Sequence, residues 1–508
     1  IKSLGESMNI QKHIRCINKM KLSIVITTVL SLSACGGSDD DNSGEGYVKL
    51  YNTVNNSPAI YLTVDEDFST SDDDIEVTYS GVPYGSSSNT NTVESGNYFY
   101  ELAWQDGDST DSSDLTVVHE DGLKISDDSI HLIVMSEDIL APSVTTYDID
   151  IIDDDDDITY DRFNFRMLNM YSDNVSIDVY LSQADETFNE ADFIGQFAYQ
   201  ELSVNQKLDQ DDYIFYFTTA GSSEILFQSN EISFSYSSQY VMAIRKNNGV
   251  GTSPYMLDKI SNSSIESFID ADSEAKFNAY NAISQHELLP EYEGTFSLYV
   301  NGFDDSPEIE DLSMGSLSEP IVLDKGDYSL DMTIADESDL LLKNHLLSLE
   351  ENTHKTAFFY LDGVEVDDDN DGDVDENGDG IVDEIRLDVH SLVVSNSSRS
   401  SIYDHEIKMI NLVDSAEFGS FTIYFVRNDE TINTAYYKKV VSFADSELLY
   451  LNNNTYQVYV VAKDNSSDII LNAFELTLDE ESKEQFMIVE VDDTQPTGYK
   501  VSLFDQTL

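Results

Sequence analysis

Apolar and polar residues alternate in short runs along most of the chain, and Gly, Asn, Asp and Ser separate the runs. Alternation with a period of two places every second side chain on the same face of a β-strand. No long run has the 3.6-residue period of an amphipathic helix. The clearest runs have apolar residues at Ile60, Leu62 and Val64, at Ile177, Val179 and Leu181, at Phe296, Leu298 and Val300, and at Phe421, Ile423 and Phe425. The pattern predicts an all-β protein.

These four runs belong to a longer pattern that recurs four times. Each run follows an apolar segment that ends in Asn, at Asn52, Asn169, Asn281 and Asn411. Next comes a bulky residue followed by a small one, at Tyr84–Gly85, Phe197–Ala198, Met314–Gly315 and Phe443–Ala444. A Tyr then opens a strand, at Tyr98, Tyr213, Tyr328 and Tyr456. The Asn and the Tyr are 44 to 47 residues apart in every copy, which indicates internal repeats.

Each copy holds about seven short strands by this pattern, and about 110 residues are enough to build one buried core. We therefore predict four tandem antiparallel immunoglobulin-like β-sandwich domains. The repeated Asn is expected to bond its own backbone at a strand end. The repeated Tyr is expected to lie in the core, with its hydroxyl satisfied at an edge.

Polar and acidic runs mark the boundaries between the copies. Asp153–Asp157 is a run of five carboxylates that cannot pack, and it indicates the first linker. Acidic and Ser-rich residues from Asn262 to Glu274 mark the second boundary, and Ser395–Ser401 marks the third. The expected repeats are residues 47–152, 158–262, 274–396 and 402–508.

Three segments of the repeats are similar in amino-acid sequence to a known family. Val48–Pro58 reads VKLYNTVNNSP, Gly81–Ser86 reads GVPYGS, and Leu323–Asp331 reads LDKGDYSLD. These segments resemble the extracytoplasmic repeats of the domain of unknown function 4397. The second and fourth copies depart from the family pattern at Asp212 and Thr455. The resemblance implies β-sandwiches outside the cytoplasm, and it supplies no activity and no catalytic residues.

The N-terminal segment has the features of an export signal. Lys19 and Lys21 precede an apolar stretch, Leu22–Leu32, which is shorter than the roughly 20 residues that span a bilayer. The residues that follow, Ser33-Ala-Cys35, complete a motif that resembles the lipobox of bacterial lipoproteins. The resemblance implies that residues 1–34 are a cleaved signal peptide and that Cys35 is acylated. Because the sequence begins with Ile, translation is expected to start at Met8 or Met20. An ordinary secretory signal with an incidental Cys is the alternative.

The residues after Cys35 indicate a destination and a tether. Gly36, where Asp would favour retention at the inner membrane, resembles the sorting signal for the outer membrane of a Gram-negative bacterium. Several acyl chains anchor a protein stably, and residues 35–46 read as a flexible tether. Cys16 is the one other cysteine and lies in the predicted signal peptide, so no disulfide is expected in the mature chain.

The charge balance limits the classes of partner. The chain has 98 acidic and 26 basic residues, for a formal net charge of −72. Such a surface repels phosphate backbones, so no nucleic-acid partner is expected. It attracts cations, and most of its carboxylates are expected to form a solvated surface.

One acidic segment, residues 367–384, has a more specific pattern. Carboxylates alternate there with other residues, and Gly372, Gly378 and Gly380 stand at turn positions. Calcium takes six to eight oxygen ligands, which such a loop can supply. The segment resembles the tandem calcium loops of thrombospondin type 3 and dockerin repeats, and a solvated acidic loop is the alternative. The expected calcium ligands are Asp367, Asp369, Asp371, Asp373, Asp375, Asn377, Asp379, Asp383 and Glu384.

The sequence contains no recognisable catalytic motif. We expect a non-catalytic, lipid-anchored array of β-sandwiches for surface interaction, adhesion or structural spacing, with a protein or polysaccharide partner. A calcium-assisted array of carbohydrate-binding modules is the first alternative. An envelope hydrolase is the second, because carboxylate pairs are abundant.

Overall fold

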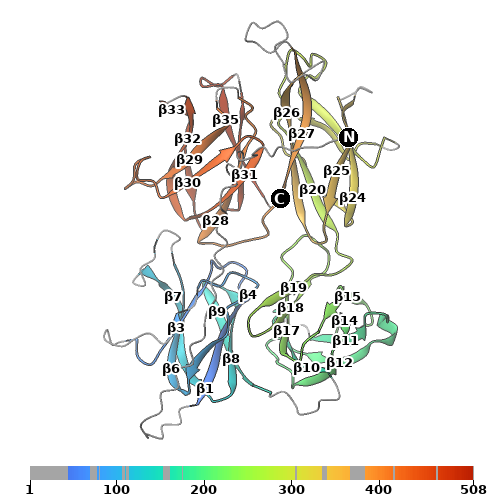
Figure 1. The fold of residues 1–508 in the computed structure, drawn as a ribbon, viewed down its shortest axis with the longest axis vertical. Helices are drawn as coiled ribbons and strands as arrows, with labels where there is room; N and C mark the ends of the chain where they lie inside the picture. The colour runs from blue at the N-terminus through green and yellow to red at the C-terminus, as the bar shows by residue number, and fades with distance from the viewer. Residues whose placement is uncertain are drawn as a thin grey trace, which may run out of the picture. The chain divides into compact units, whose positions relative to one another are not determined.

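The computed structural model describes residues 44–508 except 69–76, 79, 106–108, 110–113, 153–160, 174–175, 304–305, 335–339, 367–383, 416–417, 465–466, 493 and 507–508. The described residues form eight β-sheets (Figure 1) and include one short 3₁₀ helix, Phe188–Glu190, and no α-helix. The prediction of an all-β protein built from β-sandwiches is confirmed.

The first two sandwiches are formed by strands β1 to β19. In the first, one sheet has the order β4 (Ser86–Ser87), β1 (Glu45–Asn52), β8 (Ser129–Asp138), β9 (Ala141–Asp150), with β5 (Asn91–Glu94) also paired to β1. The opposite sheet has the order β3 (Val77–Thr78), β2 (Tyr61–Asp65), β6 (Gly96–Trp104), β7 (Thr116–Ile125). In the second, one sheet has the order β13 (Gln206–Asp209), β10 (Arg162–Asn169), β17 (Gln239–Lys246), β18 (Tyr255–Ile260), β19 (Ile265–Phe268). The opposite sheet has the order β12 (Asp192–Phe197), β11 (Ile177–Gln183), β14 (Asp212–Thr219), β15 (Ile225–Gln228), with β16 (Ile232–Ser233) also paired to β14.

The third and fourth sandwiches are formed by strands β20 to β35. In the third, the sheets have the orders β23 (Ile321–Leu323), β20 (Ala275–Asn281), β26 (His354–Glu365), β27 (Ile385–Ser395) and β22 (Ile309–Ser313), β21 (Thr295–Val300), β24 (Gly326–Ile334), β25 (Leu340–Leu349). In the fourth, they have the orders β31 (Asp445–Asn452), β28 (Asp404–Asn411), β34 (Gln485–Val491), β35 (Tyr499–Asp505) and β30 (Tyr437–Ser442), β29 (Ser420–Val426), β32 (Asn454–Asp464), β33 (Ser467–Leu478).

All four sandwiches share one strand order. The first strand of each lies between an edge strand and a parallel partner, in the pairs β1–β8, β10–β17, β20–β26 and β28–β34. The other paired strands run antiparallel. This parallel pair could not be predicted from the sequence, because side chains alternate with the same period in parallel and antiparallel strands. The common plan has eight strands rather than about seven, because edge strands as short as β4, β13 and β23 leave no alternating pattern.

The second sandwich extends beyond its predicted end at residue 262. Strand β19, Ile265–Phe268, pairs antiparallel with β18. The sequence interpretation placed a boundary there because the segment is rich in Ser and acidic residues. Backbone pairing of Ile265 with Ile260 and of Phe268 with Leu257 makes it a fifth strand of the sheet.

The repeated Asn has the structural role that the sequence predicts. In each copy its side-chain oxygen accepts a hydrogen bond from the backbone N–H two residues later, at distances of 2.9 to 3.0 Å. Its amide donates to the carbonyl oxygen of Val82, Phe197, Leu312 or Val441. All four Asn side chains are buried. The Asn therefore fixes the turn after the first strand.

The repeated Tyr also fits its prediction. The hydroxyls of Tyr213, Tyr328 and Tyr456 donate to the carbonyl oxygen four residues earlier, at 2.7 to 2.9 Å. Tyr98 is buried in the core of the first sandwich. These rings pack inward at the edge where the strand begins.

The bulky-then-small pair was misplaced in the second copy. The backbone N–H of Gly85, Gly315 and Ala444 donates to the carbonyl oxygen of the repeated Asn. In the second copy the equivalent donor is Gln200, bonded to the carbonyl oxygen of Asn169 at 2.7 Å, and not Ala198. All four donors have a positive φ, which Gly adopts most easily. The sequence interpretation chose Ala198 for its size, but this conformation also occurs at Gln200.

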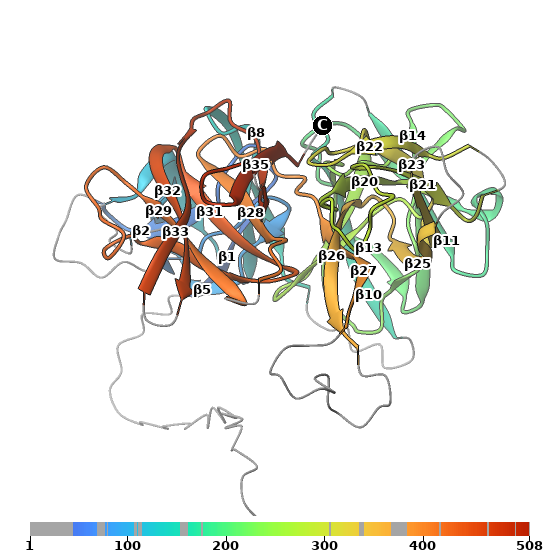
Figure 2. The same cartoon turned by 90° about the horizontal axis from the view of Figure 1, so that it is seen from above.

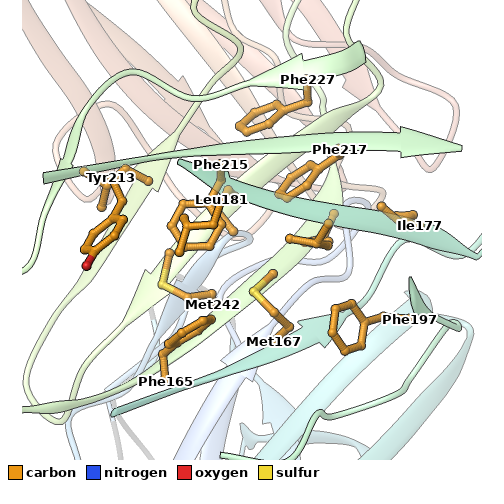
Figure 3. Close-up of a cluster of buried hydrophobic side chains, with 14 of the residues drawn as sticks. Phe165, Met167, Ile177, Leu181, Phe197, Tyr213, Phe215, Phe217, Phe227 and Met242 are labelled. Carbon is orange, nitrogen blue, oxygen red and sulfur yellow. The ribbon is translucent and has the colours of Figure 1, made fainter. Parts of the chain in front are cut away.

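Each sandwich encloses its own apolar core between its two sheets. In the second, Phe165, Met167 and Met242 from one sheet face Phe215 and Phe217 from the other (Figure 3). Two further clusters contain residues from two sandwiches each. One joins Tyr51, Leu132, Val134 and Ile149 to Leu168, Met170, Val241, Ala243 and Ile260. The other joins Tyr280, Phe358, Tyr360 and Val394 to Ile410, Leu412, Phe486 and Ile488. The first sandwich thus packs on the second, and the third on the fourth.

Candidate functional site

Most of the residues predicted from the sequence to form sites lie outside the described part of the chain. These are Cys35 and the calcium-ligand candidates Asp367, Asp369, Asp371, Asp373, Asp375, Asn377, Asp379 and Asp383. Glu384 alone is described, and it is exposed. Its carbonyl oxygen accepts a hydrogen bond from the backbone N–H of Val366 at 3.0 Å. This bond continues the antiparallel β26–β27 ladder, so these two strands form one hairpin, and they lie side by side in Figure 2.

Several charged side chains lie on strands β26 and β27 of this hairpin. Arg386 donates two hydrogen bonds to Asp388, at 2.9 and 2.8 Å, and these bonds lower the pKa of that carboxyl. Asp362 lies 3.9 Å from His390 across the two strands. Within the described ranges, no group of three or more His, Cys, Asp or Glu is placed to hold a metal ion. The calcium prediction therefore rests on the sequence of the insert.

A buried charged cluster lies between the first and second sandwiches. The Arg245 Nε donates to Asp258 Oδ2 at 2.6 Å, and the Tyr51 hydroxyl donates to the same oxygen at 2.6 Å. Burial would lower the pKa of Arg245, but the charge of Asp258 raises it above its ordinary value. Burial and the charge of Asp258 raise the pKa of Tyr51 well above its usual range. The Tyr51 hydroxyl therefore bonds, across the contact between the two sandwiches, to the buried Arg245–Asp258 pair of the second.

The Tyr84–Gly85 step of the repeat completes this cluster. Arg245 Nη1 donates to the Tyr84 hydroxyl at 3.1 Å, and the guanidinium lies over the Tyr84 ring at 4.9 Å from its centroid. Gly85 has a φ of 67°, and a Cβ there would come within 2.8 Å of the guanidinium. A glycine is therefore required both by the backbone conformation and by the close approach of Arg245.

The third and fourth sandwiches are joined by an equivalent contact. Tyr280 occupies the same position in its strand as Tyr51, one residue before the repeated Asn, and its hydroxyl donates to Glu490 at 2.6 Å. Ser502 donates to the same oxygen at 3.2 Å, and Lys500 lies at 3.2 Å from it. Neither contact was predicted from the sequence, because Tyr51 and Tyr280 each lie within one expected repeat and no pattern linked them to another.

A second buried acidic group lies at the base of the fourth sandwich. Glu484 accepts a hydrogen bond from the backbone N–H of Glu406, and burial raises the pKa of Glu484 to about 7. Arg399 donates to both oxygens of Asp404 at 2.9 Å and partly offsets that effect. Gln506 donates to Glu406 at 3.3 Å. These contacts tie the segment before β28 to the end of β35.

An open cavity of about 610 Å³ lies between the first and second sandwiches. We call it the neutral groove, because none of its twelve lining residues is charged. Tyr47, Ile130 and Thr90 contribute from the first sandwich. Asn164, Gln239 and the turn at Ser261–Ser263 contribute from the second. Its residues come from separate segments, so spacing along the chain gave no sign of it.

Comparisons with known proteins do not assign a family. No protein-family model matches the sequence, and no curated protein matches it. Among solved structures, the TIE protein of Bacillus anthracis overlaps with 86% of this chain and 69% of its own, at 10% identity and a TM-score of 0.15. BcpA, the major pilin subunit of Bacillus cereus, overlaps with 65% of this chain and 99% of its own, at 8% identity and a TM-score of 0.14. Overlaps this weak add nothing to the fold described above.

The search for a membrane-spanning helix gave no candidate in the part of the chain that the structure describes.

Proposed function

We propose that this chain is a non-catalytic lipoprotein of the cell envelope, whose β-sandwiches serve surface interaction, adhesion or structural spacing. Acyl chains on Cys35 anchor it in the outer membrane of a Gram-negative bacterium. The lipobox-like sequence before Cys35 supports the anchor, and the repeated β-sandwich architecture supports an array of binding or spacing domains.

The observation that carries this proposal is the pairing of the sandwiches through a second apolar face. Domains joined by linkers alone move relative to one another, unless a large apolar interface holds them. Here Tyr51 with Asp258 and Tyr280 with Glu490 add buried hydrogen bonds to two apolar clusters. Pairs held in this way suit a stiff spacer that presents fixed surfaces.

The buried ionisable groups support a structural rather than a catalytic role. Asp258 and Glu490 are each engaged by a hydroxyl and a cation from neighbouring strands. A catalytic acid or base must instead face a space that can hold substrate. The neutral groove offers such a space, but no carboxyl, His or Cys is among the described residues that line it.

Cys35→Ala should release the protein from the membrane fraction to the soluble fraction. The thiol is the only acylation point that the lipobox provides, and two or more acyl chains account for stable anchoring. Cell fractionation followed by immunoblotting measures the distribution. Cys16→Ala is the matched control, since that residue lies in the predicted signal peptide and should leave the anchor intact. Membrane retention of the Cys35 variant contradicts the proposal.

We further propose that residues 367–384 bind calcium and stiffen the β26–β27 hairpin. An extracellular site of this kind has a Kd on the order of 0.1–1 mM. Calcium at 10 mM should therefore stabilise the hairpin by about 2 kcal/mol and slow hydrogen exchange in Phe358–Glu365. Hydrogen exchange of the intact protein, followed by mass spectrometry, measures this effect.

Two variants test the calcium proposal. Replacing residues 367–383 with a two-residue Asn-Gly turn joins Val366 to Glu384, which keeps the register of the antiparallel hairpin, and should abolish the response to calcium. Changing Asp153–Asp157 to Asn removes five contiguous carboxylates that lack the glycine pattern, half as many as residues 367–384 contain, and should leave the response unchanged. An equal response in all three proteins would show general screening of negative charge and would refute a specific site.

A further inference from the structure

The lining of the neutral groove is unusual for this chain. Charged residues make up 24% of the sequence, and the net charge is −72. Yet the twelve lining residues are Ser, Thr, Asn, Gln, Tyr and Ile only. The volume of about 610 Å³ is within the range of about 300–1,000 Å³ that ligand sites occupy. The described lining of the groove therefore suits a ligand that is itself uncharged.

The groove is held in shape by bonds between the two sandwiches. Lys49, which is buried, donates through Nζ to the carbonyl oxygens of Ser261 at 2.8 Å and Asn262 at 3.1 Å. The Thr90 hydroxyl donates to the same Asn262 oxygen at 2.6 Å. These three bonds fix the turn at Ser261–Ser263 against the first sandwich. A site formed before the ligand arrives loses less conformational entropy on binding.

Gln239, in the same sheet as that turn, is also held in place. Its side-chain amide donates to the carbonyl oxygen of Asp150 at 2.9 Å and accepts from the backbone N–H of Ile152 at 3.2 Å. Asn164 is held by Asn205, which donates to its side-chain oxygen at 2.9 Å. Hydrogen bonds therefore fix the backbone of the turn and the side chains of Gln239 and Asn164.

Several polar groups of the groove have no hydrogen-bond partner among the described residues. They are the hydroxyls of Tyr47, Ser238 and Ser263 and the side-chain amide of Asn262. Asn262 and Ser263 are exposed, and Tyr47 is half-buried. Together they offer hydroxyl and amide donors and acceptors beside the ring of Tyr47 and the side chain of Ile130.

We propose that the neutral groove binds an uncharged saccharide, with sugar hydroxyls on the Asn, Ser and Gln side chains and a sugar C–H face on Tyr47. This inference deepens the proposed surface-interaction function and rests on it. The field of a chain with a net charge of −72 opposes anionic ligands. An extended peptide is disfavoured, because β1, β8, β10 and β17 lie between two neighbours in their sheets and offer no free edge for strand addition.

The test uses the detergent-solubilised full-length protein and an array of neutral and acidic oligosaccharides and uncharged peptides. Neutral oligosaccharides should bind, and dextran sulfate should not compete with them. Asn262→Asp combined with Ser263→Asp should lower the affinity at least ten-fold, because it removes the amide donor and the hydroxyl of these residues and adds two carboxylates that must lose water when the saccharide binds. Asn454→Asp, at an exposed polar position of the fourth sandwich, is the control and should bind as the parent does.

Each outcome decides the inference. It is overturned if no neutral oligosaccharide binds at millimolar concentration, if peptides bind instead, or if the double Asp variant keeps its affinity. Tyr47→Ala should weaken binding without changing the melting temperature. Membrane release by Cys35→Ala is independent of the groove, so loss of the saccharide site and failure of the envelope proposal are distinguished by separate measurements.

Discussion

Asp258→Ala should lower the free energy of unfolding of the second sandwich by about 3–5 kcal/mol, because it leaves a buried charge without its partner. Asp258 and Arg245 are both buried, and their closest atoms lie 2.6 Å apart. Without the carboxylate, the guanidinium keeps only the Tyr84 hydroxyl and two weaker contacts with Lys246 and Met256. The Tyr51 hydroxyl loses its acceptor as well.

Peptide-resolved hydrogen exchange of the full chain measures this loss where it occurs. Exchange should accelerate in β17 and β18 and in the facing strand β1. Asp209→Ala is the matched control, because Asp209 also pairs with an Arg, at 2.9 Å, but the two side chains are 66% and 40% exposed. An exposed pair of this kind contributes at most about 1 kcal/mol. Equal effects of the two substitutions would refute the buried cluster.

A double variant separates charge burial from packing. Arg245→Met combined with Asp258→Leu removes both charges and keeps apolar volume, so it should recover most of the stability that Asp258→Ala loses. Tyr51→Phe removes one hydroxyl from the same site and should cost about 1 kcal/mol. If the double variant is less stable than Asp258→Ala, the ion pair stabilises the fold by more than the cancellation of two buried charges.

The sequence was sufficient for the architecture of the single sandwich. Alternation placed Ile177, Val179 and Leu181 in one core, and the structure buries all three. The role of the repeated Asn could be predicted locally, because an Asn at a strand end bonds a nearby backbone N–H. The structure repeats that bond four times. Local patterns were predictable because the interactions that cause them span two to five residues.

The pairing of the sandwiches was missed, although the sequence contained a signal for it. Leu132–Met135 is a run of four apolar residues, and all four side chains are buried. Continuous apolar runs indicate strands that are covered on both faces. Ile133 and Met135 face the core of the first sandwich, and Leu132 and Val134 face the second. Alternation predicts one buried face for each strand, so the second buried face, which packs against the neighbouring sandwich, was not predicted.

The candidate sites also differ in whether they could be predicted from the sequence. A calcium loop is contiguous, so residues 367–384 could be proposed from spacing alone. The neutral groove and the Asp258 cluster combine residues more than 150 positions apart, such as Tyr51 with Asp258. No single-sequence pattern connects such positions, because their proximity depends on how two sandwiches pack.

The stability of the fourth sandwich should fall as the pH rises from about 5 to 8, because of Glu484. Burial raises the pKa of this carboxyl from 4.5 to about 7. In that interval the folded chain keeps a proton that the unfolded chain releases. The stabilisation by the protonated form is complete below about pH 4.5 and is lost as the pH passes 7. At about 1.4 kcal/mol per pKa unit, the change amounts to about 3 kcal/mol.

Glu484→Gln isolates this effect, because the amide has the size of the protonated acid and does not ionise. The variant should match the parent at pH 5 and exceed its stability by about 3 kcal/mol at pH 8. Hydrogen exchange in β34, corrected for the intrinsic pH dependence of exchange, measures the difference. Glu481→Gln changes an exposed carboxyl in the same turn and should keep the pH profile of the parent. Should Glu484→Gln keep that profile too, the buried carboxyl is not its source.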